Sequence, residues 1–311
     1  MEDINRLITS KGCVDNSYKF KGTESSSSQD EIINLIKNFN RVIFIRTGSS
    51  SKINDLNIFS VNLNYLNKDC ILVTSDGDRT VPLSYNDKTV ELILNNTFIK
   101  KWYSQNLNKK DLNEKMYKSH INLNKLEYFP IGFDFHTTRW FINNSAQDKI
   151  KYMIKIRQER GLDNRYNKIY SDSHNSISHN DRRIVKDLIK NNRLFELENF
   201  RINFAEITKK YNEYNFVISP RGNGIDCHRT WELFLAGAIV ILKTSCLDDM
   251  FLKNNLPVII LKDWSELNNL TIEDLERYLK ENREKRSLEN ILPRLTFKYW
   301  LKEYYDLRLD I

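Results

Sequence analysis

The 311-residue chain carries 48 Lys and Arg against 41 Asp and Glu, a net charge of +7. With 40% hydrophobic and 12% aromatic residues, the composition excludes a disordered tail, and the length suits two folded domains. Because the basic residues are spread along the chain, the charge favours a small phosphorylated partner over nucleic acid.

The first half alternates apolar strands with helical stretches. "SSSSQDEIINLIKNFNRVIFIR" predicts a capping box from Ser28 to Glu31, an amphipathic helix and a strand at 42–46. "CILVTSDGD" predicts a strand that ends in a polar loop at 75–78, and "LEYFPIGFDFHTT" a strand closed by a Pro-Gly turn. "VELILNNTFIKKWYSQN" contains a short strand and leaves a helix open. This alternation indicates a parallel sheet that is covered on both faces.

The second half repeats the pattern. The polar stretch after residue 140 either connects two units or begins the second one. A strand at 168–171 leads to a helix from about residue 182, with Asp181 as its predicted cap. Strands at 215–219, 238–243 and 257–261, helices near 227–236 and 272–285, and a helical last segment follow. The predicted fold class is α/β.

Residues 219–242, "SPRGNGIDCHRTWELFLAGAIVIL", place glycines and charges in a loop between a strand and a helix. Such a loop exposes backbone N–H groups beside the positive end of the helix dipole, which suits a phosphate. Gly222 and Gly224 let the backbone approach a ligand closely, and Arg221 and Arg229 offer forked donors for a diphosphate. The loop is neither a Walker loop nor a complete G-x-G-x-x-G motif.

Two acidic residues of this stretch each have two interpretations. Asp226 either caps the helix or contacts the ligand. Glu232 lies three residues after Arg229 on nearly the same helix face. It therefore either accepts hydrogen bonds from ribose hydroxyls or pairs with Arg229 within the helix.

The run S-P-R-G-N-G-x-D-x-H-R-x-W-E-x-x-x-x-G-x-x-V at 219–240 resembles the nucleotide-sugar-binding signature of exostosin-like glycosyltransferases, and more distantly that of fucosyltransferases. "PIGFDFHT" at 130–137 and "TSDGDR" at 74–79 resemble segments of exostosin-like proteins from large DNA viruses and microbes. The sequence departs from the family where Ala238-Ile239-Val240 replaces the usual small-x-Pro-Val.

The resemblance implies a GT-B architecture, in which two Rossmann-like domains with parallel sheets face a cleft. It implies a hexosyl or pentosyl transferase that moves a sugar from a UDP- or GDP-sugar to a hydroxyl of a glycan or glycoconjugate. Inversion of configuration and no required cofactor or metal are implied as well. The expected parts are an acceptor-side domain at 1–145, a nucleotide-sugar-binding domain at 146–290, and a C-terminal helix at 291–311 that packs back on the first domain.

The resemblance also implies which residues act. Arg182 and Arg183, which open a helix, are implied to reach the diphosphate. The implied donor site comprises Arg182, Arg183, Arg221, Gly222, Gly224, Asp226, Arg229 and Glu232. Candidate general bases, in no fixed order, are Asp76, Asp134 and His136, each able to take a proton from the acceptor hydroxyl.

Asp76 and Asp78 also form a D-x-D pattern, with which GT-A glycosyltransferases hold a divalent metal, because hard carboxylates suit Mg²⁺ or Mn²⁺. Asp-Gly is equally ordinary turn chemistry. A metal-dependent GT-A-like transferase and a catalytically inactive nucleotide-sugar-binding protein therefore stay open as alternatives.

The remaining expectations concern location and cysteines. The longest apolar runs are strand-sized, and the chain lacks a basic start followed by an apolar stretch, so we expect no membrane span. We expect a cytoplasmic protein, in the host cytoplasm if it is viral. Four cysteines lie far apart without a C-x-x-C motif, so neither disulfides nor a zinc site are predicted.

Overall fold

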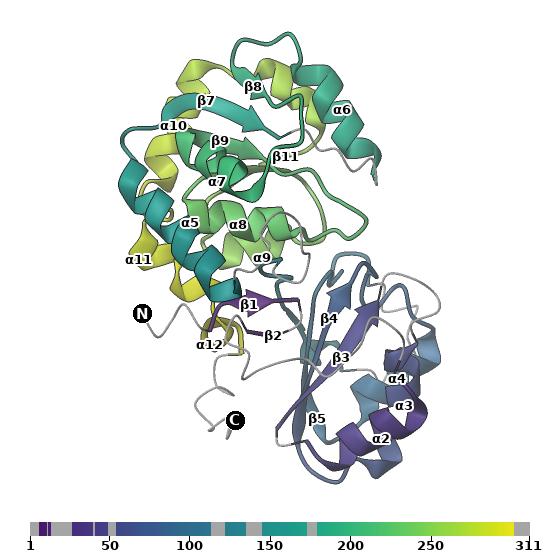
Figure 1. Cartoon of the computed structure of the whole chain (residues 1–311). Helices are drawn as coiled ribbons and strands as arrows, with labels where there is room; N and C mark the ends of the chain where they lie inside the picture. Colours follow the sequence, from purple (N-terminus) through teal and green to yellow (C-terminus); the bar gives the residue numbers. More distant parts are fainter. Residues whose placement is uncertain are drawn as a thin grey trace.

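The computed structural model describes residues 6–10, 12–13, 27–39, 41–48, 54–112, 122–134, 145–172 and 179–301. They form two α/β lobes, each built on a parallel sheet (Figure 1). In these ranges no helix is long and apolar enough to cross a membrane.

The first lobe holds a four-stranded parallel sheet in the order β3-β4-β5-β6. Its strands are β3 (Val42–Gly48), β4 (Cys70–Gly77), β5 (Ile99–Ser104) and β6 (Leu126–Tyr128). Its helices are α2 (Gln29–Lys37), α3 (Asp55–Val61) and α4 (Asp87–Asn95), with short 3-10 turns at Leu63–Tyr65 and Leu123–Lys125. The predicted capping box is confirmed, because the Ser28 hydroxyl accepts from the Glu31 N–H at 3.2 Å and the Glu31 carboxylate accepts from the Ser28 N–H at 2.7 Å.

The second lobe holds a five-stranded parallel sheet in the order β11-β10-β9-β7-β8. Its strands are β7 (Tyr166–Ser171), β8 (Phe195–Leu197), β9 (Tyr214–Ile218), β10 (Ile239–Lys243) and β11 (Val258–Leu261). Its helices are α5 (Ala146–Arg160), α6 (Asn180–Ile189), α7 (Phe204–Glu213), α8 (His228–Ala236), α9 (Asp248–Lys253), α10 (Ile272–Asn282), α11 (Leu288–Ile291) and α12 (Phe297–Leu301), with 3-10 turns at Trp264–Asn269 and Pro293–Leu295. The expected α/β class with two parallel sheets is confirmed.

Alternate residues of the second sheet enter two different cores. Val217 and Val240 pack with residues of α5, α7 and α8, whereas Phe216, Ile218 and Ile239 pack on the opposite face with residues of α6 and α10. Side chains of successive strand residues point to opposite faces, so a strand covered on both sides reads as one continuous apolar run. This explains why these strands were predictable.

The chain order reverses between β7 and β9. β8 pairs with one edge of β7 and β9 with the other, so the two connections leave the sheet in opposite directions. Open α/β sheets bind ligands outside the carboxyl ends of the strands at such a reversal. Asp172, directly after β7, and the loop 219–227, directly after β9, flank this point.

The predicted Asp181 cap was wrong, and the capping interpretation of Asp226 is not the one observed. The N-cap of α6 is His179, whose ring Nδ1 accepts from the Asp181 N–H at 3.3 Å. The N-cap of α8 is Cys227, and no side chain caps that helix. In each case the carboxylate that local sequence offered as a cap is buried and bonds to a distant residue, so tertiary contacts outweighed the local preference.

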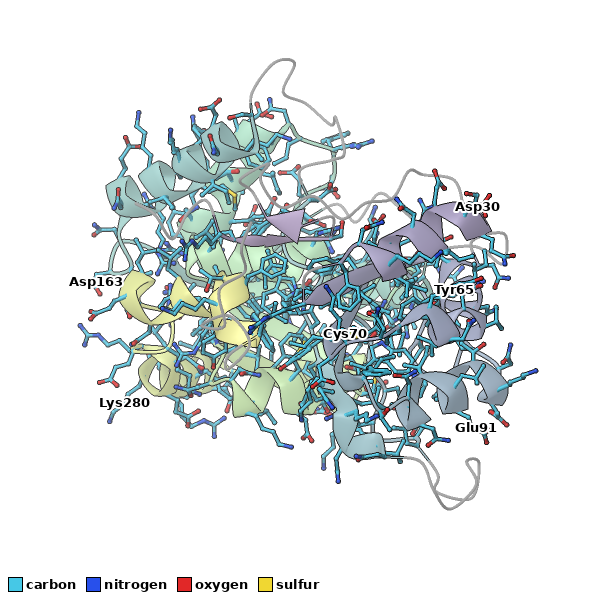
Figure 2. All side chains as sticks on the ribbon, turned by 90° about the horizontal axis from the view of Figure 1, so that it is seen from below. Asp30, Tyr65, Cys70, Glu91, Asp163 and Lys280 are labelled. Carbon is cyan, nitrogen blue, oxygen red and sulfur yellow. The ribbon has the colours of Figure 1, made fainter. Side chains whose placement is uncertain are left out.

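The two lobes share one apolar core, to which both ends of the described chain contribute. Phe297 of α12 packs against Phe44 and Phe129 of the first lobe, with ring centroids 6.1 and 5.5 Å apart. The hairpin of β1 (Ile8–Thr9) and β2 (Gly12–Cys13) lies beside it, where Ile8 C=O accepts from the Phe133 N–H at 2.8 Å. In Figure 2 side chains fill the space between the lobes, and Asp163 and Lys280 lie on the outer rim.

Gly132 is predicted to be essential for this junction. Its φ is +68°, and a Cβ there would lie 2.1 Å from the Ile8 carbonyl oxygen. Gly161 has φ +69° but nothing within 4 Å of the same position, so it is a matched control. We expect Gly161→Ala to lower the free energy of unfolding by about 1–2 kcal/mol, because its φ of +69° and ψ of −180° lie in a region that essentially only glycine adopts. Gly132→Ala should cost about 3 kcal/mol or more, because backbone must also move. Urea unfolding measures both, and equal losses would contradict the steric argument.

Candidate functional site

Polar groups of the loop 219–227 and of the helix that follows it hold part of the loop in place. The hydroxyls of Ser219 and Thr230 lie 2.9 Å apart, which ties the end of β9 to α8. The Gly222 N–H donates to the Cys227 sulfur at 3.2 Å. Cys227, which stands where a dinucleotide motif has its third glycine, thus closes the loop on itself.

Arg229 is oriented by a buried carboxylate. Its Nε donates to Asp172 Oδ2 at 2.7 Å, and the same oxygen accepts from the Tyr211 hydroxyl at 2.9 Å. The buried Nη1 of Arg229 has no hydrogen-bond partner among the described residues. A guanidinium fixed on one side and unsatisfied on the other is suited to an incoming anion, because an unpaired buried N–H group is costly.

Two further arginines meet this one. Arg182 Nε donates to the Arg221 carbonyl at 3.1 Å, and a Cβ on Gly222 would lie 3.0 Å from Arg182 Nη2. Arg221 Nε is buried, and within the described ranges it has no partner. Burial, and then the neighbouring charge of Arg229, lower the pKa of Arg182. The guanidiniums of Arg182 and Arg229 therefore lie close to each other at the reversal point, and a diphosphate would relieve their repulsion. Arg221 joins them through its backbone carbonyl.

Arg183 is not part of this group. It is exposed, and its Nη2 donates at 2.8 Å to Asn180 Oδ1 of its own helix. Of the two adjacent arginines, only Arg182 reaches the loop.

Glu232 and Asp134 approach each other from the two lobes. The pKa of Glu232 is raised to about 7, first by burial and then by the charge of Asp134, while Arg229 opposes the shift. The ion pair of Arg229 is with Asp172, so the predicted pairing of Arg229 with Glu232 within the helix is not the one formed. His136 lies outside the described residues.

Asp226 is committed to the protein itself. Its Oδ1 accepts from Trp231 Nε1 at 2.9 Å and its Oδ2 from the Ile131 N–H at 2.7 Å. Burial raises the pKa of Asp226 to about 7. With both oxygens occupied, this residue shapes the loop and joins it to the first lobe.

The D-x-D segment faces the same loop. β4 continues to Gly77, so the expected polar loop at 75–78 is largely strand, and Asp76 adopts φ +59°. A Cβ on Gly224 would lie 3.2 Å from Asp78 Oδ1. Among the residues that the structure places, no three or more His, Cys, Asp or Glu side chains are grouped to hold a metal ion.

The sequence analysis missed three residues that organise the site: Asp172, Tyr211 and Asn106. The amide oxygen of Asn106 accepts from the N–H groups of Ile225 and Asp226 at 3.0 and 2.8 Å. These two amides, like that of Gly222, already have partners within the protein and are not open to a phosphate. Asp172 and Asn106 both follow predicted strands closely. Because residues at the carboxyl ends of strands line ligand sites in α/β sheets, this position could have identified them.

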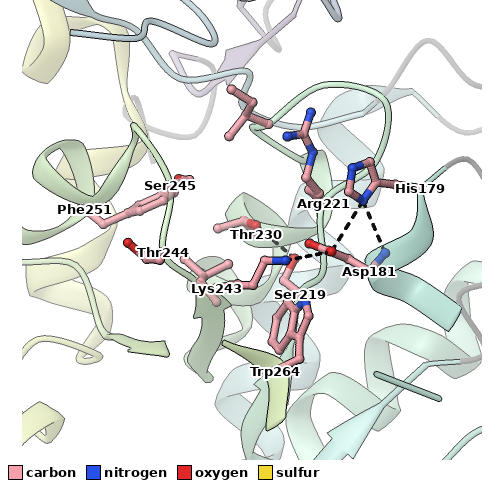
Figure 3. Close-up of a pocket in the computed structure, with 12 residues that line it drawn as sticks. His179, Asp181, Ser219, Arg221, Thr230, Lys243, Thr244, Ser245, Phe251 and Trp264 are labelled. Carbon is pink, nitrogen blue, oxygen red and sulfur yellow. Dashed lines mark hydrogen bonds and ion pairs between the residues drawn. The ribbon is translucent and has the colours of Figure 1, made fainter. Parts of the chain in front are cut away.

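A pocket opens beside the loop at the carboxyl ends of β9 and β10 (Figure 3). Arg221 enters it from the loop, and Trp264 lies at its base. Lys243 lines it too and donates to Asp181 Oδ1 at 2.8 Å. Burial, and then the charge of Arg221, lower the pKa of His179. The pocket thus combines the aromatic side chains of Trp264 and Phe251 with polar residues.

No known protein family matches the sequence, and no curated protein matches it. Solved structures with a similar fold include Anabaena Alr3699/HepE in complex with UDP and glucose (TM-score 0.43, 10% identity, covering 88% of this chain and 77% of that one). WaaG, a glycosyltransferase of lipopolysaccharide biosynthesis, has TM-score 0.38 and 11% identity, covering 86% of this chain and 95% of that one. The pneumococcal O-GlcNAc transferase GtfA in complex with UDP and GlcNAc has TM-score 0.42 and 12% identity, and the match covers 90% of this chain and 58% of that one. All these scores lie below 0.5, so the proposal below rests on the residues of the site.

Proposed function

We propose that the chain is a GT-B glycosyltransferase that moves a sugar from a nucleotide-diphosphate-sugar donor to a hydroxyl of a glycan or glycoconjugate. The observation that carries the proposal is the approach of Arg182 to Arg229 and to the Arg221 backbone at the reversal point. Arg221 and Arg229 each carry a buried N–H group without a partner among the described residues. The adjoining pocket combines aromatic, apolar and polar lining residues, as small-molecule sites do. We assign it to the nucleoside, and the space beside the three guanidiniums to the diphosphate.

The chemistry follows from the charges. As the bond between the anomeric carbon and the diphosphate breaks, negative charge develops on the leaving oxygen, and the three guanidiniums stabilise it. Asp134 takes the proton of the acceptor hydroxyl, whose oxygen attacks the anomeric carbon. A single displacement of this kind inverts the configuration. Asp134 is favoured over Asp76 and His136 because its charge acts directly on Glu232 of α8.

Glu232 and the two domains can each be assigned to the donor or to the acceptor. The half-buried carboxylate of Glu232 accepts hydrogen bonds from donor hydroxyls. Residues 1–145 form the acceptor side and residues 146–290 the donor side. Residues 291–311 form a C-terminal segment, whose described part packs on the first domain through Phe297. No divalent metal is needed, since the guanidiniums supply the positive charge; a metal held by Asp76 and Asp78 is the alternative.

Nucleoside diphosphates test this proposal. We expect at least one of UDP, GDP, CDP and ADP to raise the melting temperature by several degrees at millimolar concentration, because a ligand that binds only the folded state stabilises it by mass action. Inorganic phosphate at equal ionic strength is the control and should give a much smaller rise. If none of the four shifts the transition, the proposed function is wrong; a shift without turnover on any donor would indicate an inactive binding protein.

A further inference from the structure

Asn106 of the first lobe bonds to the backbone of the loop 219–227 in the second lobe. Its single amide oxygen accepts from two consecutive N–H groups, those of Ile225 and Asp226, while its Nδ2 donates to the Gly77 carbonyl at 3.1 Å. The residue is 1% exposed, so these bonds are formed away from water. The side chain therefore joins the D-x-D segment to the loop that opens α8.

Two converging backbone N–H groups require an acceptor. Consecutive amides that point at one place form a concavity that binds an oxygen atom. Here the Asn106 oxygen occupies it, and without that oxygen the buried N–H of Asp226 and the partly buried N–H of Ile225 would lose their acceptor. The loop conformation of the second lobe therefore depends on a residue of the first.

Ile225 connects the bond made by Asn106 to the pocket. Its N–H is bonded to Asn106, and Ile225 itself lines the pocket beside Arg221. A Cβ on the adjacent Gly224 would lie 3.1 Å from Asn106 Nδ2, so the loop closes tightly around this side chain. Displacement of the loop would move one wall of the pocket and the arginine that follows β9.

We propose that Asn106 is a positioning residue for donor binding, which makes the donor site of the second lobe dependent on the first. This inference rests on the proposed function. Asn106 adopts φ +52°, a left-handed conformation that asparagine tolerates better than most residues and glycine adopts freely. Asn106→Gly thus removes the side chain without straining the backbone.

The experiment compares dissociation constants, measured by calorimetry at 25 °C, for whichever of UDP, GDP, CDP and ADP gives the largest thermal shift. We expect Asn106→Gly to weaken binding about tenfold, equivalent to about 1.4 kcal/mol. Asn255→Gly is the matched control, because Asn255 has φ +51° and is exposed in the turn before β11, at the amino end of the sheet, whereas the loop follows the carboxyl end of β9. It should leave the dissociation constant unchanged.

The outcomes separate the inference from the function on which it rests. A purely structural role would lower the melting temperature of the unliganded Asn106→Gly protein but leave the dissociation constant of the folded protein as in the wild type, which would overturn the inference alone. Absence of binding to the wild-type protein would overturn the proposed function and the inference with it. Weakened binding by Asn106→Gly together with intact binding by Asn255→Gly supports both.

Discussion

Arg229→Ala should abolish the rise in melting temperature that nucleoside diphosphates produce. The variant removes the guanidinium whose unpaired Nη1 is available to the diphosphate and whose orientation Asp172 fixes. Two charge-assisted hydrogen bonds contribute about 3 kcal/mol together, which corresponds to a loss of affinity of about 100-fold. Differential scanning fluorimetry with and without the nucleotide measures the effect.

Arg183→Ala is the control for this substitution. Arg183 is also basic and lies on the neighbouring helix α6, but it is exposed and bonded to Asn180, so its removal should leave the response unchanged. Arg229→Lys keeps the charge near Asp172 and lacks the fork, so it should fold like the wild type and recover only part of the shift. A full shift in Arg229→Ala would remove this residue from the proposed site.

Asp134→Asn should reduce turnover about 1,000-fold while nucleotide binding stays intact. An amide of the same shape cannot take the proton of the acceptor hydroxyl, and general-base catalysis contributes roughly 10²–10⁴ in rate. The loss should appear in kcat, because the carboxylate acts on the acceptor and not on the diphosphate. The turnover is measured as transfer of the sugar from the donor to a glycan acceptor, once a donor has been identified by nucleotide binding.

Asp76→Asn and His136→Gln test the other two candidate bases in the same assay. If either variant loses turnover to that extent and Asp134→Asn does not, the base has been assigned to the wrong residue. Running the assay in EDTA tests the metal alternative at the same time. Activity that disappears in EDTA and in Asp78→Asn would indicate a metal-dependent transferase.

Local pattern predicted the elements that carry the site. The strand, loop and helix around residues 219–236 were predicted because an apolar run, two glycines and a charged helix start are adjacent in the sequence. By contrast, α5 was not predicted, although Ser145 and Asp148 form a capping box. Its buried face includes Lys149 and Arg157 among apolar residues, so the hydrophobic periodicity is weak in the sequence.

The sequence by itself determined the α/β class and the clustering of arginines and glycines in one loop, because strands, helices and turns depend on residues a few positions apart. Only the tertiary structure decided which partners these residues have. Arg229 meets Asp172 from 57 positions away, Asp226 meets the Ile131 N–H from 95, and Asn106 meets the Asp226 N–H from 120. Such pairs form because burial removes water as an alternative partner, so each polar group must take whichever complement the packing of the two lobes brings within reach.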